Sequence, residues 1–122
     1  MKTFKSIILI SLIIFATSDL LAQKKVDPSG TWTFHAEEAP YEYNTGDIVV
    51  DKDGKEYTAK IVFGGDYELK GTSVTYEKNE LSFKFFIEGE SIHIKTTVGK
   101  DSMEGTASYS GGDITITANK KS

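Results

Sequence analysis

Strict alternation of apolar and polar residues is the feature that most limits how this chain can fold. It begins at residue 31, and no stretch shows sustained helical spacing. Successive side chains of a β-strand point to opposite faces of a sheet, so the alternation predicts half-buried strands. We expect eight of them, at about residues 31–36, 48–51, 56–63, 67–77, 81–88, 92–98, 102–109 and 114–119.

Short turn signals separate nearly all of these strands. Asp53-Gly54, for example, tolerates the positive φ angles of a tight hairpin turn. Residues 37–46 carry no alternation, and Pro40 and Gly46 mark them as a loop that is long for a hairpin. Within 67–77 the apolar register reverses, which predicts a bulge or sharp bend near residues 71–73.

An all-β fold follows, because the connections are too short for helical crossovers between parallel strands. An eight-stranded antiparallel up-and-down barrel would remove the exposed edges of such a meander. A two-sheet sandwich is the alternative architecture.

The first residues have the layout of a secretory signal peptide, with basic Lys2 and Lys5, an apolar run from Ile7 to Ala16 and small Ala22 at the expected cleavage point. An uncleaved anchor is the alternative, but the run is about half of the roughly 20 residues that span a bilayer. We therefore expect a signal peptide over 1–22, a lead-in over 23–30 and a barrel domain over 31–120. The mature protein is expected to be secreted or periplasmic, without membrane insertion.

Charge and composition narrow the classes of partner. The chain has 14 basic and 18 acidic residues; without Lys2, Lys5 and Asp19, which precede the cut, 12 and 17 remain, a net charge of −5. None of the basic residues is arginine. An acidic, arginine-free surface argues against a nucleic-acid partner. The absence of cysteine excludes disulfides and a lipid-modified cysteine after Ala22.

The head of the first strand, Gly30-Thr31-Trp32, resembles the Gly-x-Trp signature of the calycin superfamily, which includes lipocalins and avidins. The resemblance implies that Gly30 and Trp32 lie at the closed end of the barrel. In that superfamily a basic side chain of the last strand, usually arginine, packs across the indole. Here Lys120 or Lys121 would take its place. The biotin-binding activity of avidins does not carry over, because that pocket uses several tryptophans and Trp32 is the only one here.

The order of Gly-x-Trp, Ala39-Pro40-Tyr41, Gly46 and a meander ending in Ile114-Thr115-Ile116-Thr117 also resembles small secreted domains of Bacteroidota. These domains have no established function. In calycins the first loop is commonly a lid over the open mouth, which would give this role to the loop that contains Tyr41 and Tyr43.

Residues for catalysis or metal binding are sparse. His35 and His93 fall on outward faces of different strands, and no cysteine nucleophile exists. Asp51-Lys52-Asp53-Gly54 lacks the glycine and glutamate positions of a calcium loop and is interpreted as a hairpin turn. We expect no enzymatic activity, no cofactor and no metal site.

We expect a non-enzymatic binding module with a small apolar or amphipathic ligand inside the barrel. The inward face mixes large and small residues, although the same mixture would also suit a packed core. A protein-interaction module, such as an inhibitor or accessory domain of a secreted hydrolase, is the alternative, with outward Phe86 as a contact. A cavity above roughly 300 Å³ would favour the carrier. The candidate ligand-binding residues are Phe34, Tyr41, Tyr43, Tyr57, Thr96 and Tyr109.

Overall fold

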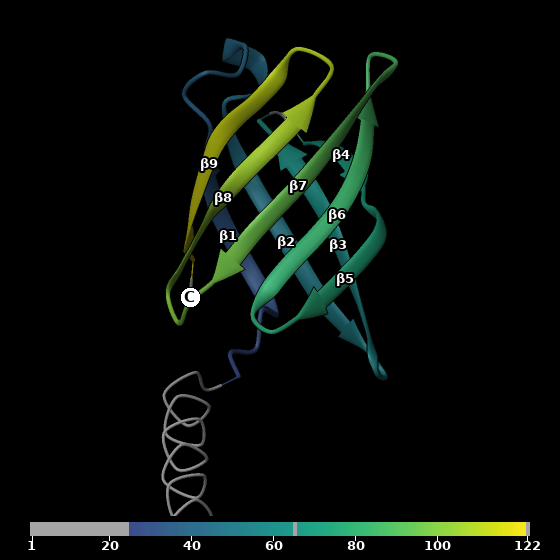
Figure 1. Cartoon of the computed structure of the whole chain (residues 1–122), viewed down its shortest axis with the longest axis vertical. Coiled ribbons are helices and arrows are strands. Elements are labelled where there is room, and N and C mark those ends of the chain that lie inside the picture. Colours follow the sequence, from purple (N-terminus) through teal and green to yellow (C-terminus); the bar gives the residue numbers. More distant parts are fainter. Residues whose placement is uncertain (1–24, 65, 122) are drawn as a thin grey trace, which may run out of the picture.

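One antiparallel sheet, in the order β4-β3-β2-β1-β9-β8-β7-β6-β5, makes up almost the whole fold (Figure 1). The computed structural model describes residues 25–64 and 66–121, so the predicted signal peptide over 1–22 lies outside the described residues. The strands are β1 (Gly30–His35), β2 (Thr45–Asp53), β3 (Glu56–Phe63), β4 (Tyr67–Lys70), β5 (Thr72–Glu77), β6 (Glu80–Ile87), β7 (Glu90–Val98), β8 (Ser102–Tyr109) and β9 (Gly112–Lys120).

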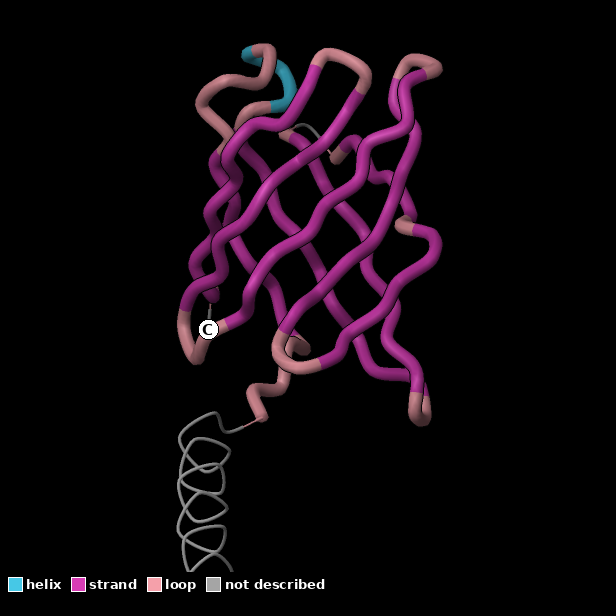
Figure 2. The backbone as a smooth tube through the Cα atoms, viewed as in Figure 1, coloured by secondary structure: helices cyan, strands magenta, loops and turns pink. Residues whose placement is uncertain are grey.

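The sheet curls into a nearly closed barrel (Figure 2), which confirms the predicted all-β, antiparallel barrel. Nine strands form it rather than eight, because the segment predicted as one strand over 67–77 changes partner. Its first part, β4, pairs with β3, and its second part, β5, pairs with β6. The two edge strands of the sheet are therefore consecutive in the chain, and their shared corner brings the two edges together.

Gly71 lies at this corner and is buried. Its N–H donates to the carbonyl of Ala59 at 2.8 Å. A Cβ at this position would lie 2.8 Å from the Ala59 carbonyl oxygen and 2.9 Å from the Phe83 ring, so only glycine fits without a shift. The pairing of β5 with β6 shifts register between Thr72 and Thr75, as the reversed apolar pattern predicted.

The alternating apolar residues form one core, as the period-two pattern predicted. Most inward positions in the long strands are buried, whereas inward residues near the strand ends, such as Tyr57, Ile92 and Ile114, are half-buried; the outward positions are exposed or half-buried. The fully enclosed side chains of this core include Trp32, Phe34, Ile48, Val50, Ile61, Leu81, Phe83, Ile94 and Ile116.

Trp32 is buried at the end of the barrel that carries both described chain ends. Trp32 has 0% exposure, and its Nε1 donates to the carbonyl of buried Pro28 at 2.9 Å. The Lys120 Nζ lies 5.4 Å from the centre of the Trp32 ring. Gly30, with φ of 131°, leaves room for the Lys120 stem, because a Cβ there would lie 2.9 Å from its Cε. Gly30, Trp32 and Lys120 thus meet at this closed end.

The lead-in before β1 helps to fill the same end. The Val26 N–H donates to the Asn79 side-chain oxygen at 3.1 Å, and the Tyr76 hydroxyl donates to the Val26 carbonyl. Burial raises the pKa of Tyr76. These contacts join the lead-in to the β5–β6 hairpin.

The opposite end carries the first loop, residues 36–44. A single turn of 3-10 helix, η1 (Tyr41–Tyr43), lies in it, and β2 begins at Thr45 (Figure 2). The ordered loop is thus slightly shorter than the predicted 37–46. Of the residues that the structure describes, none belongs to a helix long and apolar enough to cross a membrane.

Candidate functional site

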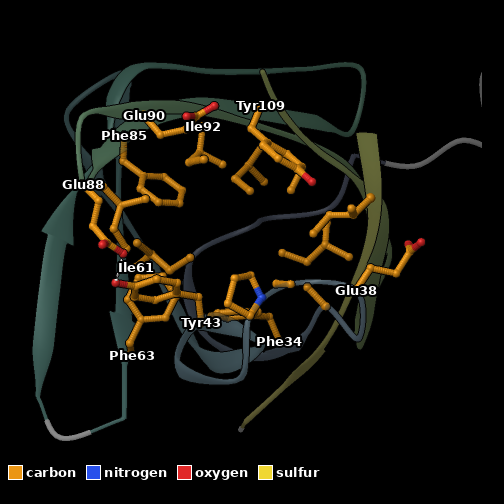
Figure 3. Close-up of a pocket in the computed structure, with 18 residues that line it drawn as sticks. Phe34, Glu38, Tyr43, Ile61, Phe63, Phe85, Glu88, Glu90, Ile92 and Tyr109 are labelled. Atoms are coloured by element: carbon orange, nitrogen blue, oxygen red, sulfur yellow. Dashed lines mark hydrogen bonds between the residues drawn. The ribbon is translucent and has the colours of Figure 1, made fainter. Parts of the chain in front are cut away.

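A cavity of about 370 Å³ lies in the barrel beneath the first loop, at the end opposite Trp32 (Figure 3). Its walls come from β1, β3 and β6 to β9, so both halves of the chain contribute. The lining residues are Phe34, Ala36, Glu38, Ala39, Pro40, Tyr43, Ile61, Phe63, Phe85, Ile87, Glu88, Glu90, Ile92, Ile94, Ala107, Tyr109, Ile114 and Ile116.

Aromatic and branched aliphatic side chains make the cavity walls apolar. The Phe34 and Phe63 rings meet edge to face at 5.9 Å, and Phe63 lies 6.4 Å from Phe85. Ala107 of β8 and Ala36 and Ala39 of the first loop contribute small side chains to the lining, which leave space beside the rings. A pocket of this size is at the lower end of the range that holds small organic ligands.

A hydrogen bond joins the first loop to the β6–β7 turn at the rim. The Tyr43 hydroxyl donates to the Glu88 carboxylate at 2.5 Å. This bond raises the pKa of Tyr43 from its ordinary value of 10 to about 12, because the tyrosinate could not donate to the carboxylate. The Tyr43 ring also packs on Phe63, with 5.0 Å between ring centres, so the side chain belongs to both rim and wall.

Two further carboxylates lie at the rim. Glu90 accepts from the Ser110 N–H at 2.7 Å, and hydrogen bonding from Ser110, through its side chain and its backbone, lowers the pKa of the Glu90 carboxyl. Glu38 lies on the other side of the cavity, with its carboxylate turned away from the centre (Figure 3), and accepts from the Thr115 N–H at 3.4 Å. Both bonds connect the rim to β8–β9.

Three of the six candidate ligand-binding residues line this cavity, namely Phe34, Tyr43 and Tyr109. Tyr41 does not, although it is only two residues from Tyr43. The 3-10 turn directs it outward, and 89% of its surface is exposed.

The other two candidates lie away from the cavity. Tyr57 is the second residue of β3, near the closed end, where its ring packs on Tyr76 at 5.3 Å. Thr96 faces the interior but lies below the cavity, and its buried hydroxyl donates to the Met103 sulfur at 3.4 Å. For a strand residue, facing inward is therefore not sufficient, because its position along the strand decides whether it reaches the cavity.

Sequence reasoning missed the rim carboxylates Glu38, Glu88 and Glu90. Consecutive connections of an antiparallel meander alternate between the two ends of the barrel, so every second turn joins the mouth. The turn at 88–89 is at the same end as the loop at 36–44 by this rule. Counting the connections along the sequence would therefore have placed these acids at the same end of the barrel as the first loop.

A serine–histidine pair lies outside the cavity. The Ser82 Oγ is 2.7 Å from the His93 Nε2, on outward positions of β6 and β7, whereas His35 is exposed. The structure therefore pairs His93 with a serine, which the sequence had not predicted. Within residues 25–64 and 66–121, no group of three or more histidines and acids could hold a metal ion.

Comparison of the chain with protein-family models, with curated proteins and with solved structures finds no match. The fold and the cavity define its class: a nearly closed antiparallel β-barrel with Trp32 buried at one end and an apolar cavity at the other.

Proposed function

We propose that the protein is a secreted or periplasmic, non-enzymatic carrier that holds a small apolar or amphipathic ligand in this cavity. The observation that carries the proposal is the apolar cavity of about 370 Å³ with polar groups only at its rim. Enclosure in apolar walls provides affinity for the body of a ligand, and sparse polar groups orient it.

The closed-end arrangement supports a relationship to the calycins. Trp32 beneath the Lys120 ammonium is the contact that the Gly-x-Trp resemblance implied, with lysine in place of the usual arginine. The resemblance concerns architecture, and the ligand is proposed from the cavity alone.

The cavity also favours the carrier over the protein-interaction module, which was expected to have a filled barrel. Phe86 is 63% exposed on the outer face of β6. If another protein binds the outer face of the barrel, substitution of Phe86 should weaken that binding.

Uptake of N-phenyl-1-naphthylamine, a neutral dye whose fluorescence rises in apolar surroundings, tests the proposal. We expect saturable uptake by the purified mature protein and weaker uptake by Ala107→Leu, which places three more carbon atoms in the cavity. Phe86→Ser is the matched control, because it removes an apolar side chain from the outer surface and should leave uptake unchanged.

Loss of the signal in Phe86→Ser with retention in Ala107→Leu would locate the dye on the outer face and contradict the proposal. No uptake by the folded protein, together with no co-purified ligand in native mass spectra, would also contradict it.

A further inference from the structure

The two ends of the barrel differ sharply in charge. The four connections at the open end are residues 36–44, 64–66, 88–89 and 110–111. None of them contains a lysine, and their acidic residues are Glu37, Glu38, Glu42, Asp66 and Glu88. The lead-in, the turns and the last described residue at the closed end contain two acids, Asp27 and Asp101, but also five lysines, Lys25, Lys55, Lys78, Lys100 and Lys121.

The cavity opens at the acidic end, so these negative charges surround its mouth. Glu88 and Glu90, on either side of Gly89, contribute directly to its lining. Among the described lining residues there is no lysine to neutralise them. An apolar cleft bordered by charges of one sign concentrates ions of the opposite sign at its mouth.

Hydrogen bonds hold the rim carboxylates in place. Glu90 is fixed by Ser110, which lowers the pKa of its carboxyl, and Glu88 is fixed by Tyr43. A bound cation would therefore meet carboxylates that are already positioned.

Aromatic rings accompany the carboxylates. Tyr43 and Tyr109 both line the cavity and both lie near its rim (Figure 3). Aromatic faces attract ammonium groups, and more strongly where water is partly excluded. Carboxylates and tyrosine rings above an apolar chamber are thus suited to a positively charged head on an apolar body.

We infer that the ligand is a cationic amphiphile, an organic amine whose ammonium group lies at Glu88 and Glu90 while its hydrocarbon part fills the cavity. This inference rests on the proposed carrier function and adds the charge of the ligand. An anionic amphiphile such as a fatty acid would place its carboxylate against these acids and is disfavoured.

Displacement of N-phenyl-1-naphthylamine by octylammonium, 1-octanol and octanoate at neutral pH tests the inference, because the three have eight carbon atoms each and differ mainly in the charge of the head group. We expect octylammonium to bind at least about tenfold more tightly than octanoate, with octanol between them. The ratio should fall as the salt concentration rises from about 0.01 M to 0.15 M, because ions screen exposed charges.

The double variant Glu88→Gln/Glu90→Gln should reduce this ratio to less than about threefold while still taking up octanol. Glu77→Gln/Glu80→Gln is the matched control, because it removes two glutamates that flank the β5–β6 turn at the closed end. It should keep the full preference.

Equal binding of the three probes, or tighter binding of octanoate, would overturn the inference and leave the carrier function standing. An unchanged preference in Glu88→Gln/Glu90→Gln would overturn the assignment of these residues. Failure of the dye and all three probes to bind would remove the carrier function as well.

Discussion

The Tyr43 hydroxyl lies 2.5 Å from the Glu88 carboxylate and joins two segments that are 45 residues apart in the chain. One segment is the first loop, and the other is the β6–β7 turn. The bond thus ties the loop over the cavity to the strands that form its far wall. Because its donor is a titratable phenol, the bond can be followed by pH.

Tyr43 should ionise at a higher pH than the ordinary tyrosine pKa of 10. Its pKa is raised above the ordinary value of 10, so the folded state favours the protonated phenol. The stability that this bond contributes is complete below pH 10 and is lost as the pH rises from 10 to about 12. The tyrosinate absorbance of the protein minus that of Tyr43→Phe should titrate near pH 12. A difference that titrates near pH 10 would show that the bond is absent in solution.

Trp32→Ala should lower the free energy of unfolding by about 3–5 kcal/mol, as for other large core truncations. The indole is fully buried, and its removal would also leave the Pro28 carbonyl without its donor. Urea unfolding measures the change. Tyr41→Ala, which truncates an aromatic ring that is 89% exposed, should change it by less than about 0.5 kcal/mol. Similar losses in the two variants would mean that Trp32 does not anchor the closed end.

Gly71→Ala should destabilise the fold by about 1–3 kcal/mol, because its Cβ would overlap the Ala59 carbonyl and the Phe83 ring. The control is Gly64→Ala, where a Cβ meets no atom within 4 Å and the change should be less than about 0.5 kcal/mol. Urea unfolding of both variants tests whether the β4–β5 corner needs glycine. Equal stability of the two would argue against the tight corner.

Ala107→Leu and Ala59→Leu make the same change at two buried alanines. Ala107 borders the cavity, whereas Ala59 is buried in the core and does not line it. We expect Ala59→Leu to cost about 1–3 kcal/mol through overpacking and Ala107→Leu to cost less than about 1 kcal/mol. Thermal or urea unfolding measures both costs. A larger cost for Ala107→Leu would mean that the space beside it is filled.

The alternation in the sequence was sufficient to predict which side chains face inward. Trp32, Phe83 and Ile94 are buried as expected, because the two faces of a strand follow from the geometry of a single strand. The turns could be predicted as well, because the conformation of a tight turn such as Asp53-Gly54 depends on residues adjacent in the sequence. The sheet class, most strand positions and three cavity residues could therefore be predicted without knowledge of the fold.

Only the tertiary structure settled the features that depend on residues distant in the chain. Gly71 divides one predicted strand into two because β3 and β6 approach it from opposite edges of the sheet. Tyr41 and Tyr43 are alike in sequence, yet only Tyr43 meets Phe63 and Glu88. The cavity itself is the volume that side chains from six strands leave unfilled. The period-two pattern predicts whether each side chain points inward or outward. The volume of the cavity depends on how all the strands pack together.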